Sequence, residues 1–140
     1  MTLALNKDEL SAYLREVFPQ VHRDFVVEEL HHDHLVMRLR VEDRHLRPGG
    51  TVSGPSMFAL ADVAVYAMVL ARVGRKALAV TTNCSLDFMR KPAAGVDLIA
   101  HCKLLKLGRV LAVGDVLIYS EGAPDPVARA SMTYSIPPER

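Results

Sequence analysis

The sequence is poor in cysteine and carries no block of like charge. Its 140 residues include two cysteines, and its formal net charge is +1. Cys84 and Cys102 form neither a CxxC pair nor a spacing typical of metal ligands, so we expect free thiols in a reducing compartment. The absence of a basic run argues against nucleic acid as the main partner.

Long uncharged apolar runs and a recognisable leader are also missing. No such run approaches the roughly 20 residues that span a bilayer, and no basic region precedes an apolar one at the start of the chain. Internal repeats, linkers and low-complexity segments are absent too. Half of the residues are hydrophobic, which is enough for a core. We therefore expect residues 1–140 to form one cytoplasmic domain that does not bind membranes.

Hydrophobic periodicity predicts two helices. The first covers residues 6–18, where Asn6 and Glu9 have the spacing of a capping box. The second covers residues 55–73 and is apolar nearly all round, with a single carboxylate at Asp62. A helix of this composition is buried on most sides, so an aspartate within it needs a reason.

Alternating or continuous apolar runs predict six strands. They cover residues 24–30, 35–41, 77–90, 96–107, 109–120 and a last strand that follows Asp125-Pro126. The order of helix, two strands, long helix and four strands predicts an α+β domain with one mostly antiparallel sheet. Such a sheet covers one side of the long helix, and a partner subunit is the economical way to cover the other.

A glycine-rich turn leads into the long helix. Gly49 and Gly50 permit positive φ, Ser53 is a suitable N-cap, and Pro55 suits the first helical turn. A helix start of this kind presents unpaired backbone N–H groups at the positive end of the helix dipole. It is a ready site for an anion, or for the oxyanion that forms when a carbonyl is attacked.

The motifs of this chain resemble a known family. The turn Gly50-Thr51-Val52-Ser53-Gly54, the pair Ala61-Asp62 and the later segment Phe88-Met89-Arg90-Lys91-Pro92-Ala93 are similar to those of hotdog-fold acyl-CoA thioesterases. The group in question is typified by the phenylacetate-pathway thioesterase, and the resemblance covers nearly the whole chain in element order. It implies a six-stranded sheet wrapped around the central helix. It also implies a homodimer or dimer of dimers with active sites at the subunit interface.

Two positions depart from the family pattern. The family usually has His-Gly-Gly at the turn, where this chain has Ser53-Gly54-Pro55. It often has an asparagine seven residues before the central glycine, where this chain has Arg47. The central glycine and the helix aspartate are retained, so the resemblance still implies thioester hydrolysis with a different set of polar groups.

The resemblance assigns the central chemistry to two residues. Asp62 is the candidate base that activates water, or the nucleophile that forms an anhydride, and the sequence leaves both routes open. The backbone N–H of Gly54 is the candidate oxyanion donor. The structural alternatives are an Asp62 that pairs with Arg72 or Thr81, and a glycine required only by the tight turn.

Three polar side chains complete the candidate site. Thr81 falls where relatives carry a hydroxyl residue that helps to orient the water. Asn83, expected on the same face of its strand, is a candidate partner of the substrate or of Asp62. Ser53 either donates to the thioester or caps the helix. For Thr81 and Asn83 the alternative is an ordinary place on the surface of the sheet.

The spacing between the two central residues has a consequence of its own. Eight helical residues place Gly54 and Asp62 about 12 Å apart along the axis. One carbonyl cannot contact both groups within one chain. If both act, they come from different subunits whose helices run antiparallel across a two-fold axis, and this predicts an obligate dimer.

The expected substrate, an acyl-CoA, carries anionic phosphates on a long pantetheine arm. Basic residues at strand or loop ends are candidates to bind these phosphates. They are Arg47, Arg90, Lys91, Lys106 and Arg109. Each alone is better explained as a solvated surface charge, and we expect one or two of the group to contact CoA. We expect no separate cofactor and no metal, and we interpret His31-His32-Asp33-His34 as a surface turn.

Two other functions remain open at this stage. A hotdog hydratase or dehydratase usually pairs an aspartate with a histidine after the helix start, and here no histidine follows Asp62 until His101. A non-catalytic acyl-CoA-binding or regulatory module is compatible with the missing turn histidine and asparagine. The sequence leaves open which acyl group is bound and whether the assembly is a dimer or a tetramer.

Overall fold

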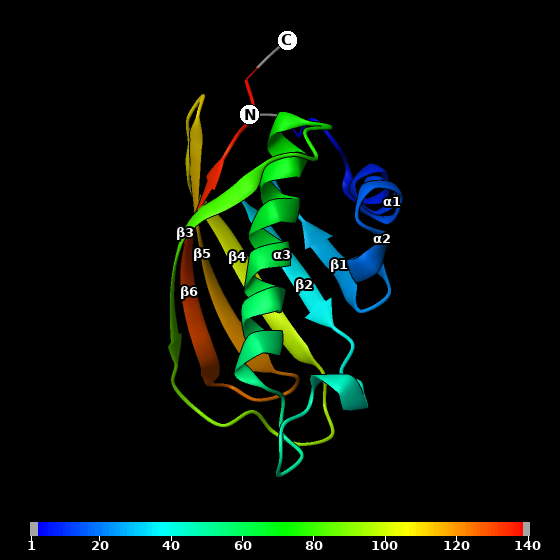
Figure 1. The fold of residues 1–140 in the computed structure, drawn as a ribbon, viewed down its shortest axis with the longest axis vertical. Coiled ribbons are helices and arrows are strands. Elements are labelled where there is room, and N and C mark those ends of the chain that lie inside the picture. The colour runs from blue at the N-terminus through cyan, green and yellow to red at the C-terminus, as the bar shows by residue number, and fades with distance from the viewer. Residues whose placement is uncertain (1–2, 139–140) are drawn as a thin grey trace.

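A six-stranded antiparallel sheet wraps around one long helix (Figure 1). The computed structural model describes residues 3–138. Its elements are α1 (Lys7–Val17), α2 (Pro19–His22), β1 (Phe25–Leu30), β2 (His34–Leu39), the 3-10 turn η1 (Asp43–His45), α3 (Gly54–Val73), β3 (Val80–Phe88), β4 (Leu98–Leu107), β5 (Leu111–Ser120) and β6 (Pro126–Ser135). The expected α+β class and hotdog arrangement are confirmed, and the order of the two long helices and six strands is as predicted, but α2 and η1 were not predicted.

The strands follow the order β1-β2-β4-β5-β6-β3, and every neighbouring pair is antiparallel. The chain leaves β2, passes through α3 and returns to the far edge of the sheet as β3 (Figure 1). Within the described chain, β3 therefore pairs with β6 on one side and leaves its other side open. Because β3 also contacts the central helix, this open edge lies close to α3.

Local sequence sets the limits of the helices. Asn6 and Glu9 form the expected capping box at the start of α1. Ser53 accepts a hydrogen bond from the N–H of Ser56 at the start of α3, and Gly74 ends that helix with φ of 94°. By length and composition α3 is apolar enough to cross a membrane, but two thirds of it is buried inside the domain. That burial is typical of a core helix.

The side of α3 that faces away from the sheet is largely covered by the chain itself, although the sequence predicted that a partner subunit covers it. Twelve of its residues are buried, and the chain before α1 hydrogen-bonds to the end of α3 through the N–H groups of Ala4 and Leu5. What remains open is a stripe of residues at helical spacing near the helix start. Pro55 and Phe58 are exposed on this stripe, and Ala59 and Asp62 are half-buried. Within the described chain, the uncovered part of α3 is thus limited to its first turns and does not run along the whole helix.

Cys102 provides a test of how tightly the core is packed. Both cysteines are free, and Cys102 is fully buried. Burial raises the pKa of the Cys102 thiol to about 12, so at pH 8 almost none of it is the reactive thiolate. We expect a thiol reagent to modify Cys102 only after denaturation, as measured by mass spectrometry. Labelling of both cysteines within minutes in the native protein would contradict this packing.

Candidate active site

Two hydroxyl groups hold the carboxylate of Asp62. Thr81 Oγ1 donates to Asp62 Oδ1 at 2.5 Å, and Tyr134 Oη donates to the same oxygen at 2.7 Å. Tyr134 Oη also lies 3.1 Å from the backbone oxygen of Asp62. Arg72 is engaged elsewhere, since its guanidinium donates to the carbonyl of His32 at 2.6 Å. Of the two structural partners considered for Asp62, Thr81 is present and Arg72 is not.

A β-bulge in β3 brings Thr81 to this carboxylate. Thr81 is the register partner of Tyr134, but the next pair is Asn83 with Thr133, so Thr82 has no partner in the ladder. Cross-strand partners point to the same face of a sheet. Thr81 therefore shares the inner face with Tyr134, and Asn83 shares the outer face with Thr133.

The expectation that Thr81 and Asn83 lie on one face is therefore wrong. An unbroken period of two would place them together, and the extra residue of the bulge reverses the second one. Asn83 is exposed, and within one chain it is not brought to Asp62. Thr81 is half-buried beside the carboxylate, as its candidate role requires.

Tyr134 is the functional candidate that the sequence did not reveal. It is buried on β6, and burial, followed by the negative charge of Asp62, raises the pKa of its hydroxyl. The group therefore stays protonated and can donate. Tyr134 lies in the strand predicted after Asp125-Pro126, but no local signal in the sequence indicated its contact with α3.

The start of α3 presents a free backbone donor. Ser53 Oγ accepts from the N–H of Ser56 at 3.3 Å and donates to the Ser56 hydroxyl at 3.0 Å, so Ser53 acts as the cap. The N–H of Gly54 has no hydrogen-bond acceptor within the described part of the chain. The ring of Phe88 lies over this glycine, where an added Cβ would stand 3.2 Å from Cζ. The N–H of Gly54 and the exposed ring of Phe88 thus both lie at the start of α3.

A buried histidine fixes the loop that precedes this helix start. The ring Nδ1 of His45 accepts the N–H of Glu42 at 2.8 Å, and its Nε2 lies 3.3 Å from the Asp24 carboxylate. The carbonyl of His45 accepts the N–H of Ser53 at 2.8 Å. The N-cap residue is therefore tied to the body of the domain, which holds the backbone at Gly54 in place.

The candidate phosphate-binding residues do not gather in one place. Arg47 is exposed in the loop before α3, and Lys91 is exposed after β3. Arg90 is also exposed and donates to the carbonyl of Pro126. Arg109 lies at the opposite end of α3, in a hollow lined by Val73 at the end of that helix. Lys106 is exposed close to the turn at Gly108, so one chain separates Arg109 and Lys106 from the other three by the length of the helix.

The described residues contain no group of three or more histidine, cysteine, aspartate or glutamate side chains placed to hold a metal ion. His31 and His34 stack at 5.9 Å between ring centroids, and His34 stacks on His101 at 5.7 Å. Burial and the neighbouring His34 lower the pKa of His101, so this ring is neutral near pH 7. The row lies on the outer face of the sheet, away from Asp62.

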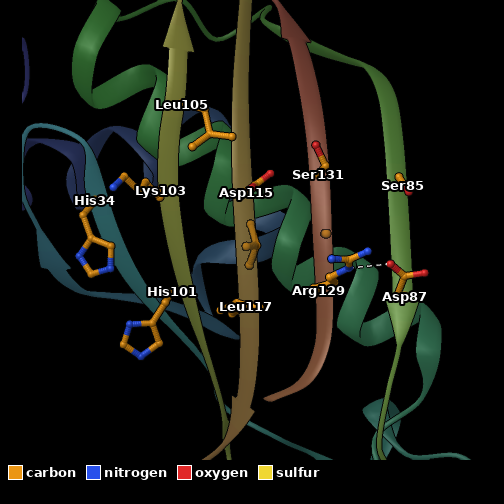
Figure 2. Close-up of a pocket in the computed structure, with 12 residues that line it drawn as sticks. His34, Ser85, Asp87, His101, Lys103, Leu105, Asp115, Leu117, Arg129 and Ser131 are labelled. Atoms are coloured by element: carbon orange, nitrogen blue, oxygen red, sulfur yellow. Dashed lines mark hydrogen bonds and ion pairs between the residues drawn. The ribbon is translucent and has the colours of Figure 1, made fainter. Parts of the chain in front are cut away.

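The groove in Figure 2 lies on the same outer face. It has a volume of about 600 Å³ and is bordered by His34 and His101 on one side and by the ion pair between Arg129 and Asp87, 2.8 Å apart, on the other. The close-up shows α3 behind the sheet, with these side chains pointing away from it. The groove is therefore separate from the Asp62 site.

Comparison with known proteins gives matches over most of the chain. The family model described as the thioesterase superfamily matches residues 49–126. A Silicibacter protein whose structure is described as that of a thioesterase is 67% identical, with 99% of this chain and 96% of that chain covered and a TM-score of 0.93. A Pseudomonas aeruginosa protein named as an esterase is 34% identical over 104 residues, which are 74% of this chain and 75% of that protein. The phenylacetic acid degradation protein PaaI of Thermus thermophilus is 28% identical, with 85% and 99% of the chains covered and a TM-score of 0.73.

Proposed function

The chain belongs to the thioesterase superfamily, and on that premise we propose that it is an acyl-CoA thioesterase. It hydrolyses the thioester to free CoA and a carboxylic acid. The observation that carries this proposal is the Asp62 carboxylate, held by Thr81 and Tyr134 on the open stripe of α3. The N–H of Gly54, which has no acceptor among the described residues, supplies a donor for the oxyanion.

The proposed active unit is a homodimer that forms along β3. An unpaired edge strand invites pairing with a second chain, and the open edge of β3 is flanked by exposed apolar side chains. Leu78, Val80 and Phe88 are 81%, 55% and 53% exposed. A two-fold axis at this edge runs the two α3 helices antiparallel and brings Gly54 of one subunit toward Asp62 of the partner subunit.

The same two-fold symmetry brings together basic residues that lie far apart within one chain. With Gly54 of one helix opposite Asp62 of the other, the end of each α3 extends about 16 Å past the start of its partner, on the side where the partner's preceding loop lies. Arg109 of one subunit thereby approaches the loop that carries Arg47 of the other, with Arg90 and Lys91 nearby. We propose that some of these four residues bind the CoA phosphates, because clustered cations suit an anionic nucleotide. Asn83 faces outward within one chain, so we assign it no role in this site.

Hydrolysis then proceeds in balanced steps by one of two routes. In the first, the Asp62 carboxylate takes a proton from water as the water oxygen attacks the thioester carbon. In the second, the carboxylate attacks directly and forms an anhydride that water then opens. In both, the carbonyl oxygen gains negative charge beside the Gly54 N–H, the carbon–sulfur bond breaks, and the CoA sulfur leaves as a thiolate. The thiolate takes up the proton held by Asp62 in the first route, and a proton from the water that opens the anhydride in the second, so that the Asp62 carboxylate is regenerated.

The test is free-thiol release from a panel of short-chain, medium-chain and aryl acyl-CoAs. Turnover of at least one thioester supports the proposal. Tight binding of acyl-CoAs without turnover would favour a non-catalytic binding module, to which the altered Ser53-Gly54-Pro55 turn points.

Two free cysteines support a reducing compartment, and we propose a cytoplasmic location.

A further inference from the structure

We infer that Tyr134 is a positioning residue for Asp62, and that Oδ2 of Asp62 is the oxygen that acts on the thioester. Tyr134 and Thr81 together fix the other oxygen, Oδ1. This inference rests on the proposed function and names the reacting atom within it. It assigns to β6 a part in the site that neither the turn motif nor the helix motif contains.

The geometry separates the two carboxylate oxygens. Oδ1 receives both hydroxyl donors, at 2.5 Å from Thr81 and 2.7 Å from Tyr134. Oδ2 receives no hydrogen bond from any described residue. Asp62 is half-buried on the open stripe of α3, and its environment is therefore closed around one oxygen and open at the other. The open oxygen is the one that water or a thioester can reach.

Tyr134 also ties the side chain of Asp62 to its own backbone. Its hydroxyl is within 3.1 Å of the Asp62 carbonyl and 2.7 Å of Oδ1. Because the Tyr134 hydroxyl contacts both the backbone oxygen and Oδ1 of Asp62, it restrains rotation of the carboxylate about the side-chain bonds of Asp62. Because Tyr134 and Thr81 are register partners on paired strands, the two donors are fixed relative to each other by the sheet.

No neighbouring hydroxyl replaces Tyr134 in the described site. The ring of Tyr66 lies 6.0 Å from that of Tyr134, but the Tyr66 hydroxyl donates to the carbonyl of Ala77 at 2.7 Å. Cys84 lies on the same strand as Thr81, and burial, followed by the charge of Asp62, raises the pKa of its thiol. This thiol makes no hydrogen bond to Asp62 among the described contacts. Replacement of Tyr134 thus leaves Asp62 with Thr81 alone.

The experiment is a double-mutant cycle on kcat. Tyr134→Phe keeps the ring and removes the hydroxyl, and we expect it to lower kcat about tenfold with KM changed by less than about twofold. Thr81→Val is expected to act in the same direction, and Thr81→Ser, which restores a hydroxyl, is expected to recover most of the rate. In an Asp62→Asn background, Tyr134→Phe is expected to lower kcat no further, because Tyr134 acts only by orienting the Asp62 carboxylate.

A second measurement needs no turnover. A phenolic proton bonded to a carboxylate gives a low-field, slowly exchanging proton NMR signal, which we expect in the wild type and expect to be lost in both Tyr134→Phe and Asp62→Asn. The inference is overturned if Tyr134→Phe retains wild-type kcat, or if it costs the same factor in both backgrounds. A wild type that hydrolyses no acyl-CoA contradicts the proposed function instead, and the proton signal then decides whether Tyr134 positions Asp62.

Discussion

Replacement of Asp62 by asparagine is expected to lower kcat for thioester hydrolysis by about a hundredfold or more. The amide has nearly the same shape, and its oxygen still accepts hydrogen bonds from Thr81 and Tyr134, so we expect the fold to persist. What is lost is the ability to take a proton from water or to attack the thioester. Free-thiol release measures the rate, and a thermal melt checks that the fold is unchanged.

Asp87→Asn is the matched control for this substitution. Asp87 is an exposed aspartate on the outer face of the sheet, where it pairs with Arg129 at 2.8 Å. Its loss removes an exposed ion pair that solvent screens, and we expect hydrolysis at the wild-type rate. If Asp62→Asn keeps hydrolysis within about threefold of the wild type, Asp62 is neither base nor nucleophile.

Replacement of Gly54 by proline is expected to lower kcat by about a hundredfold to a thousandfold, because it removes one oxyanion donor. Gly54 is the first helical residue, where a backbone N–H has no intrahelical acceptor and proline is well tolerated. Ser53 is extended, with φ of −75° and ψ of 156°, which is the conformation required before proline. The helix start is thus expected to form without its N–H.

Gly54→Ala separates the loss of the N–H from the addition of side-chain atoms. Both substitutions add a Cβ that meets the ring of Phe88 at 3.2 Å, and the free end of that exposed ring can shift. Alanine keeps the N–H, so we expect its kcat to stay within about tenfold of the wild type. Equal losses in the alanine and proline variants would show that crowding, and not the N–H, limits the rate.

Local signals in the sequence were sufficient for the two long helices and the six strands of this fold, but not for the short helix α2 or the turn η1. The capping box at Asn6 and Glu9 marks the start of α1, and the turn before Ser53 marks the start of α3, because both depend on residues close in sequence. The apolar composition of α3 indicated burial, but it did not show which part stays open. That depends on where the chain before α1 docks, as the bond from Ala4 to Ala71 shows.

The site itself depends on contacts between distant segments. Asp62 and Thr81 were recognised because each lies in a family motif or at a matching position. Tyr134 is 72 residues from Asp62, and the two meet because α3 packs against β6, while the register of β3 on β6 sets Thr81 beside Tyr134. The bulge at Thr82 places Asn83 on the other face, and no turn residue in the sequence marks it. Long-range register therefore decides which polar residues reach the carboxylate.

The central claim is that each active site takes Gly54 from one subunit and Asp62 from the other, and a mixed dimer tests it most directly. Asp62→Asn and Gly54→Pro chains, each nearly inactive alone, are co-expressed and purified together through two different tags. Each mixed dimer then contains one intact site, made from the Gly54 of the first chain and the Asp62 of the second. The isolated mixed dimer is predicted to have about half of the wild-type kcat per dimer, as two independent sites on a two-fold axis require. A mixed dimer no more active than the average of its parents would contradict a shared site.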